Sequence, residues 1–292
     1  SVYAQMNDAK FDQNVLAYIP AQSPAYFTYN INLEQAYEQA YKVLLPLLSD
    51  EKNAQIAMNV LTLELLNEFI NKEALFDTYK GSMFGTFNGI KKVKIKKIQF
   101  DYDETFAYTE VETETEAEMP IFTLGFSTAR ADVPELVLKH MARLSSRVQR
   151  FENYWRIDNA ILDAAPLYII NTGKLLIFTN DEDLARLHPK GYGKGALGKK
   201  QCKLARQSGF MYGSVDIPKT LDGFPTEVLT PRNAEIVSSL KGKSGQLVLT
   251  SSETNAEHTT FKMSYSYEGT ESTGKHLLDL VNSLYLIYTL NP

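Results

Sequence analysis

The sequence predicts an α+β protein in which mostly antiparallel sheets pack against amphipathic helices. Short segments whose apolar residues alternate with period two are interspersed with longer segments at helical spacing. Residues 171–174 (NTGK) separate two apolar runs, as the turn of a β-hairpin does. Of the 292 residues, 44% are hydrophobic and 22% are charged, so the chain can build a globular core without disulfides.

Periodicity and capping residues place the individual elements. Asn32 precedes a helical run and has Gln35 three residues later, which is typical of a capped helix start. Asp132 begins another run, with Pro134 in its first turn. The predicted helices span residues 33–48, 50–71, 231–240 and 273–288, with others beginning at residues 132 and 181. The predicted strands span residues 25–31, 82–88, 91–118 as a long hairpin, 120–128, 167–170, 175–179, 210–217, 245–251 and 259–267.

The chain is expected to form a first α+β half over residues 1–190 and a smaller half over residues 205–292, or one integrated domain. Residues 191–200 (GYGKGALGKK) predict a mobile loop or an internal boundary. The order strand, helix, glycine-led strand, strand, helix occurs in both halves. We interpret this order as an internal duplication of one unit; the alternative is two ordinary halves that share turn chemistry.

Residues 91–97 (KKVKIKK) contain five lysines, and glutamates follow at every second position from residue 110 to residue 118. Folding this segment about Asp103 places lysines opposite glutamates, as Lys96/Glu110, Lys94/Glu112 and Lys92/Glu114. Opposite charges that face each other across strands stabilise a sheet by roughly 0.2–1 kcal/mol per pair. The pattern favours a charge-paired hairpin over a phosphate-binding patch.

Charge and cysteine content exclude several classes of function. The net charge of −5 argues against general nucleic-acid binding, which needs a basic face. Cys202 is the only cysteine, so neither an intrachain disulfide nor a multi-cysteine metal site can form. No apolar run is long enough for a transmembrane helix. The chain begins at Ser1 rather than at methionine, so we expect either a cleaved leader or a trimmed terminus.

No catalytic, cofactor or metal site is predicted. Residues 193–198 (GKGALG) match GxGxxG but lack the preceding strand that a dinucleotide fold requires. His140, His188, His258 and His276 lie far apart in the sequence, and neither HExxH nor GxSxG occurs. We expect a protein without enzymatic activity. Paired carboxylates of an unrecognised hydrolase would leave no signature in sequence spacing, so that alternative stays open.

The aromatic residues supply the one candidate binding cluster. The chain has 17 tyrosines, 15 phenylalanines and one tryptophan. Phe151, Tyr154 and Trp155 gather three of them within five positions and are the candidate binding residues. Exposed on a concave surface they would bind a peptide or a small ligand; in β-rich segments such residues more often pack in the core.

A family resemblance rests on VLAYIPAQSPAYFTYNIN, YKGSMFGTFNG, PLYIINTGKLLIFTNDEDLAR, GFMYGSVDIPK and HLLDLVNSLYLI. In these segments the chain resembles a family of uncharacterised cell-envelope proteins of the Bacteroidetes, catalogued as a domain of unknown function. The resemblance implies an exported protein of the periplasm or cell surface, often lipid-anchored at a cysteine after the leader. No such cysteine lies near Ser1. The family has no established catalytic residues, so the resemblance implies none here.

The sequence therefore predicts a non-catalytic, exported envelope protein with a binding or scaffolding role. Two alternatives remain. One is an unrecognised hydrolase that acts on envelope polymers, and the other is a peptide or small-ligand binder that uses exposed aromatic residues.

Overall fold

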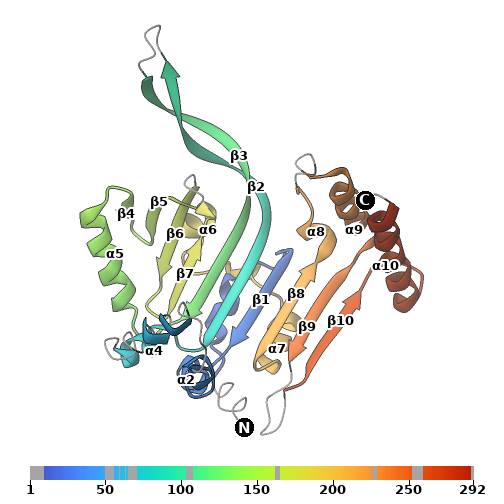
Figure 1. Ribbon diagram of the computed structural model, residues 1–292, viewed down its shortest axis with the longest axis horizontal. Helices are drawn as coiled ribbons and strands as arrows, with labels where there is room; N and C mark the ends of the chain where they lie inside the picture. The colour runs from blue at the N-terminus through green and yellow to red at the C-terminus, as the bar shows by residue number, and fades with distance from the viewer. Residues whose placement is uncertain are drawn as a thin grey trace.

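The computed structural model describes the chain except residues 1–9, 50–55, 59, 63, 65–70, 103–107, 162–164, 225, 227–228, 252–258 and 291–292. Ten strands form one antiparallel sheet in the order β10-β9-β8-β1-β2-β3-β7-β6-β5-β4, which confirms the α+β class (Figure 1). The strands are β1 (Ala25–Asn30), β2 (Ser82–Tyr102), β3 (Tyr108–Ser127), β4 (Val148–Arg150), β5 (Trp155–Ile161), β6 (Ala165–Asn171), β7 (Leu175–Thr179), β8 (Met211–Asp216), β9 (Gln246–Ser251) and β10 (Phe261–Ser266). The helices are η1 (Gln13–Tyr18), α2 (Leu33–Ser49), α4 (Lys72–Thr78), α5 (Asp132–Leu144), α6 (Glu182–Leu187), η2 (Gly193–Gly195), α7 (Lys199–Gln207), α8 (Ile217–Thr220), α9 (Pro231–Lys243) and α10 (Thr273–Leu290).

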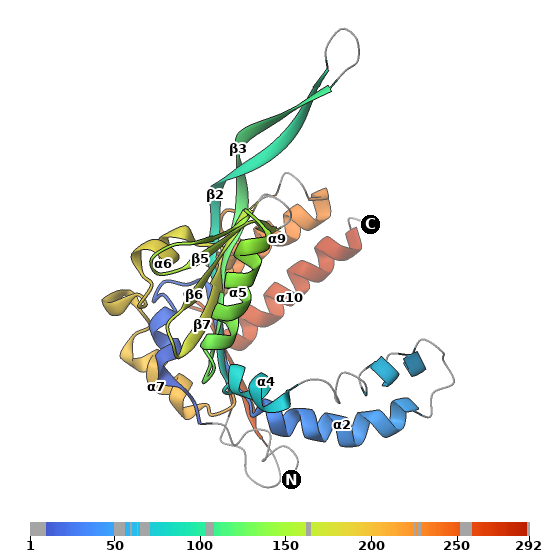
Figure 2. The same ribbon diagram turned by 90° about the vertical axis from the view of Figure 1, so that its left-hand side faces the viewer.

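The two faces of the sheet differ in cover. On one side, here called the closed face, η1, α6 and α7 pack against the strands; α2, α5 and α10 lie on the other side, the open face (Figure 2). Along β1 the side chains of the closed face, such as Tyr26 and Thr28, are buried, while those of the open face, such as Phe27, are half-buried. The main core lies on the closed face and includes Val15, Ile19, Phe84, Ile177 and Leu184.

A repeated unit forms the centre of the sheet. The first copy runs β1, α2, β2, β3, α5 and the second runs β8, α9, β9, β10, α10, so the order predicted from the sequence recurs in the structure. Because β1 pairs antiparallel with β8, equivalent strands meet in the middle of the sheet. Two hydrogen bonds of equal length repeat there, from the Asn30 amide to the Phe210 carbonyl and from the Asp216 amide to the Pro24 carbonyl, both 2.8 Å.

Further contacts match under the same correspondence. The Ile31 amide donates to the Gly81 carbonyl at 2.8 Å, and the Ile217 amide donates to the Gly245 carbonyl at 3.1 Å. The copies are therefore equivalent in register as well as in connectivity. An approximate two-fold axis passes between β1 and β8, where Phe27 lies opposite Gly213.

The long hairpin is confirmed, but its predicted register is wrong. In the structure Lys96, Lys94 and Lys92 lie opposite Glu114, Glu116 and Glu118, a shift of four positions along the second strand. The expected turn at Asp103 lies outside the described residues, and the last pair before it is Tyr102 with Tyr108. Because the shift is even, lysine positions still pair with glutamate positions along the two strands. The predicted strands 82–88 and 91–118 were separated by a gap. In the structure β2 runs through this gap with a β-bulge, where Gly89 takes a φ of 89° that glycine tolerates.

Residues 191–200 are tied to the N-terminal segment rather than forming a free linker. The Ala21 amide donates to the Gly195 carbonyl at 2.8 Å, the Tyr192 amide to the Ala17 carbonyl at 2.8 Å, and the Leu197 amide to the Ile19 carbonyl at 3.0 Å. Since η1 packs on the closed face, this segment helps to cover the core. The second half also shares the sheet with the first, through the pairing of β8 with β1.

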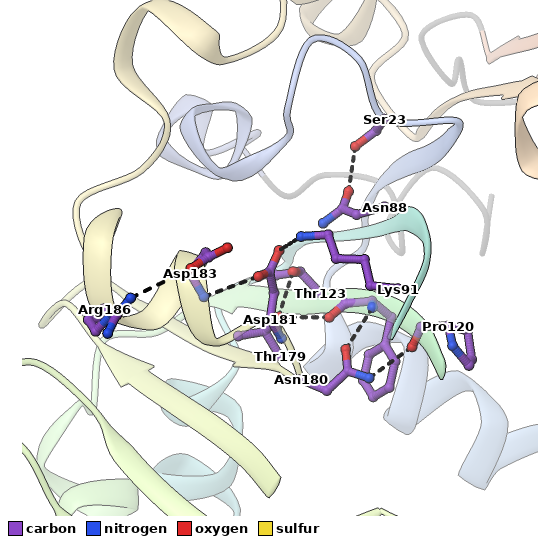
Figure 3. Close-up of polar contacts among 11 residues, drawn as sticks. Ser23, Asn88, Lys91, Pro120, Thr123, Thr179, Asn180, Asp181, Asp183 and Arg186 are labelled. Carbon is purple, nitrogen blue, oxygen red and sulfur yellow. Dashed lines mark hydrogen bonds and ion pairs between the residues drawn. The ribbon is translucent and has the colours of Figure 1, made fainter. Parts of the chain in front are cut away.

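Polar side chains hold the base of the long hairpin, where β7 ends and β3 continues beyond it (Figure 3). The Asn180 Nδ2 donates to the Pro120 carbonyl at 2.8 Å, and its Oδ1 accepts from the Phe122 amide at 2.9 Å. The Asn180 side chain thus forms the two hydrogen bonds to β3 that the backbone of one more paired β7 residue would form. Lys91 lies 3.6 Å from the Asp181 carboxylate, and Asp181 also caps α6.

Replacing Asn180 with alanine should lower the free energy of unfolding by about 1–3 kcal/mol, because the Phe122 amide and the Pro120 carbonyl would lose their partner in a partly buried setting. Chemical denaturation measures this loss, and hydrogen exchange at the Phe122 amide should accelerate. Asn233→Ala, on an exposed turn of α9, is the control and should change stability by about 0.5 kcal/mol or less. Equal losses in the two variants would contradict the role of Asn180.

Candidate ligand-binding site

A row of apolar residues crosses the open face at right angles to the strands. Strand pairing aligns one residue from each of six strands, and side chains in such a row share one face of the sheet. The row, from β3 to β10, is Leu124, Gly85, Phe27, Gly213, Leu249 and Met263. It thus extends across both copies of the repeated unit.

A pocket of about 420 Å³ lies on this row and is here called the trough. Besides the row, its lining includes Phe87, Met211, Val215 and Leu247. None of the described residues that line it is charged, and nearly all of its surface is apolar. Such a volume and lining are typical of a site for a small apolar molecule.

Two glycines of the row, Gly85 and Gly213, determine where the floor of the trough is filled and where it is hollow. The ring of Phe27 lies over Gly85, where a Cβ atom would collide with it and would approach Leu124 Cδ2 to 3.0 Å. At Gly213 a Cβ atom would lie no closer than 3.5 Å to its nearest neighbours, the Tyr26 carbonyl oxygen at 3.5 Å and the Phe27 Cβ and Cα at 3.7 and 4.0 Å, which are ordinary contacts. Gly213 is the equivalent of Phe27 in the second copy. The floor is therefore hollow where the first copy carries an aromatic ring.

The helices of the two copies cover the sheet unequally. In the first copy Leu138 of α5 packs against Trp155, Ile169 and Leu176 and closes that part of the open face. In the second copy α10 contacts α9 (Figure 2), and Phe261 and Met263 of β10 remain 51% and 69% exposed. Of the helices in the described part of the chain, Figure 1 shows none in front of β1 and β8. The trough therefore lies where neither α5 of the first copy nor α10 of the second copy covers the sheet.

The predicted aromatic cluster does not form one site. Phe151 stacks on Tyr154 with ring centroids 4.8 Å apart, and Tyr154 packs against the core of the closed face. Trp155, only 2% exposed, belongs to the cluster beneath α5 on the other face. Its Nε1 donates to the Glu135 carboxylate at 3.0 Å, and the Arg150 guanidinium lies 5.2 Å from its ring. Trp155 thus has a packing role, while binding by Phe151 and Tyr154 stays a prediction.

The other candidates from the sequence are dispersed. His276 stacks on Tyr267 at 3.6 Å in a polar pocket of about 320 Å³ between α9 and α10, His188 lies beside Tyr192, and His140 is exposed on α5. His258 lies outside the described residues. The Cys202 thiol donates to the Leu197 carbonyl at 3.3 Å. Among the described residues no cluster of three or more His, Cys, Asp or Glu side chains is placed to hold a metal ion.

Carboxylates gather in a second polar pocket, between α2 and α4. This pocket of about 220 Å³ is lined by Glu34, Glu38, Glu73 and Asp77 together with two lysines. Lys80 pairs with Asp77, and Lys42 lies 3.5 Å from Glu38, so part of this charge is neutralised. The alternative of an unrecognised hydrolase stays a prediction.

Comparisons with known proteins identify no family for this chain. No protein-family model and no curated protein matches the chain. One solved structure, titled "Structure of crystal form I of TP0453", covers 95% of this chain and 88% of its own, at 10% sequence identity and a TM-score of 0.37. So low a score supports no conclusion about fold or function. No helix in the described part of the chain has the length and apolar character needed to cross a membrane.

Proposed function

We propose that the protein is a non-catalytic binding protein that holds an apolar small molecule in the trough. The observation that carries this proposal is the hollow over Gly213, an apolar concavity at the centre of the sheet. An empty apolar concavity on a folded protein exposes surface that water solvates poorly, so a ligand that covers it gains roughly 25 cal/mol for each Å² of apolar surface removed from water.

The lining supports binding rather than chemistry. General acid–base catalysis and covalent catalysis need a titratable or nucleophilic group beside the bound molecule. In the described lining the polar side chains are those of Tyr26, Thr86 and Ser214, which alternate with the floor residues and are buried toward the closed face. Burial raises the pKa of Tyr26 above its ordinary value, so its hydroxyl stays protonated and uncharged.

A variant that fills the hollow tests this proposal. Gly213→Leu adds a side chain where the backbone has room for one, so the fold should be kept and the trough closed. The uncharged fluorophore N-phenylnaphthylamine should bind the wild-type protein in a saturable way, and the variant should bind it at least about tenfold more weakly. Thermal unfolding should show the variant to be at least as stable as the wild type.

Gly242→Leu is the matched control, because Gly242 lies in α9, away from the trough, with open space where a side chain would be. It should bind the fluorophore as the wild type does. Saturable binding that survives Gly213→Leu unchanged, or no binding by the wild type, would refute the proposal.

We also propose that the protein is exported to the periplasm or cell surface, with a lipid anchor in its precursor. The resemblance of the sequence to envelope proteins supports this location. Cell fractionation with antibody detection is the test, and recovery from the cytosol alone would refute it.

A further inference from the structure

We infer that the ligand is the hydrocarbon chain of a single-chain amphiphile, lying extended across the strands while its polar head stays outside the trough. This inference rests on the proposed function and adds the shape and chemical class of the ligand.

The first argument is the shape of the apolar surface. The row from Leu124 to Met263 crosses six adjacent strands, so it spans five strand spacings, or roughly 24 Å. Both ends are accessible, since Leu124 is 43% exposed and Met263 is 69% exposed. A compact molecule over Gly213 would leave both ends in water. An extended chain would cover the row from end to end.

The second argument is the kind of side chain. Most of the floor and rim is aliphatic or thioether, with Leu247, Leu249, Val215, Met211 and Met263 on the side of the second copy. Methionine and leucine adapt to a flexible chain, whereas planar ligands are usually held between aromatic rings. On that side of Gly213 the described lining has no aromatic side chain directed to the open face. The lining favours a saturated chain over a fused-ring ligand.

The third argument is the absence of polar partners. A ligand head that is charged or that forms hydrogen bonds would lose its hydration in the trough without gaining a partner from the described lining, which is unfavourable. The head therefore stays in water beyond an end of the row. The consequence is that affinity depends on the length of the chain and only weakly on the head.

Calorimetry with monomeric saturated fatty acids of increasing length tests the inference. Affinity should rise by up to about fourfold for each added methylene group, the upper value corresponding to full burial, and should level off when the chain is as long as the trough. Monoacylglycerols of the same lengths should bind within about threefold of the acids, because the head lies outside. Gly213→Leu should abolish binding of both series.

A charged substitution at one end of the row tests whether the ligand is long enough to reach that end. Met263→Glu should weaken binding of the longest chains about tenfold and weaken N-phenylnaphthylamine binding much less, because a compact ligand over Gly213 covers less of β10 than a chain that extends to Met263. Phe261→Glu is the matched control, since Phe261 is an exposed apolar residue of the same strand that does not line the trough. It should affect neither ligand.

The outcomes distinguish this inference from the proposed function. If the fluorophore binds and Gly213→Leu blocks it, but affinity for the chains does not depend on their length, the ligand class is wrong and the binding function stands. Binding only to vesicles, and not to monomeric amphiphiles, would also overturn the ligand class. If neither ligand binds, both proposals fail.

Discussion

Replacing Phe84 with alanine is expected to lower the free energy of unfolding by about 3–5 kcal/mol. The Phe84 side chain is 0% exposed on the closed face, and its ring lies against Gly125. A Cβ atom on Gly125 would come within 2.9 Å of Phe84 Cζ and 3.1 Å of Ile177 Cγ1, so the two residues fit only as a ring over a glycine. Glycine cannot fill the space that the ring leaves, so the cavity should remain. Urea denaturation measures the loss.

Phe27→Ala is the matched control for Phe84→Ala. Phe27 also lies over a glycine, Gly85, but on the open face, where it is half-buried. Its truncation should cost about 1–2 kcal/mol, because less apolar surface leaves water there on folding. It should also deepen the trough and change ligand affinity, which Phe84→Ala should not do directly. Equal losses of stability in the two variants would contradict the difference between the two faces.

Elements with strong local signals were predictable from the sequence. The NTGK turn defines β6 and β7, and the structure gives Gly173 a φ of 84°, as such a turn requires. β5 was missed because its alternation is interrupted, with Asn159 at a φ of 54° and a register shift between Ile157 and Ile161. α7 was missed because it is short and mostly polar (KKQCKLARQ), with Ala205 as its one buried residue, so too few apolar positions mark a helix. Much of the helix expected over residues 50–71 lies outside the described residues, and residues 56–58, 60–62 and 64 are helical.

The trough could not be predicted from the sequence, since it depends on long-range register. Its row joins Leu124, Phe27 and Met263 across strands that are far apart in the chain, and one residue of slip would turn the row to the other face. A signal was present nonetheless. Aligning AYFTYN with MYGSVD, the central strands of the two units, sets Phe27 against Gly213. This difference in size marks the place where the two copies diverge.

Several aromatic residues pack in the core, where they stabilise the fold. Tyr26 and Tyr212 are equivalent in the two copies and are 8% and 1% exposed on the closed face, where their hydroxyls lie 3.2 Å apart across the approximate axis. They lie beneath the floor of the trough and fix β1 against β8. The same tyrosines make the stability of the protein sensitive to alkaline pH.

The protein is expected to lose stability steeply above about pH 10. Burial raises the pKa of Tyr26, Tyr192 and Tyr212, and burial together with the Glu182 carboxylate raises the pKa of Tyr168 to about 12. Below pH 10 a tyrosine is protonated in both the folded and the unfolded chain, so the raised pKa does not change the free energy of unfolding. Above pH 10 the unfolded chain releases the proton and the folded chain keeps it. Each such tyrosine then removes about 1.4 kcal/mol of stability per pH unit until its folded pKa is reached.

Tyr168→Phe isolates one of these groups, because it removes the hydroxyl and keeps a ring that is 3% exposed and in edge contact with Tyr154. Between pH 10 and 12 the variant should lose up to about 2.7 kcal/mol less than the wild type, as urea denaturation at each pH would measure. Tyrosinate absorbance of the folded protein should show fewer groups titrating near pH 10 than the unfolded protein does. Tyr285→Phe, at a position 63% exposed on α10, should keep the wild-type slope. If Tyr168→Phe also kept that slope, the Tyr168 hydroxyl would have to be in contact with water in the folded protein, and the packing of β6 against α6 on the closed face would have to be loose.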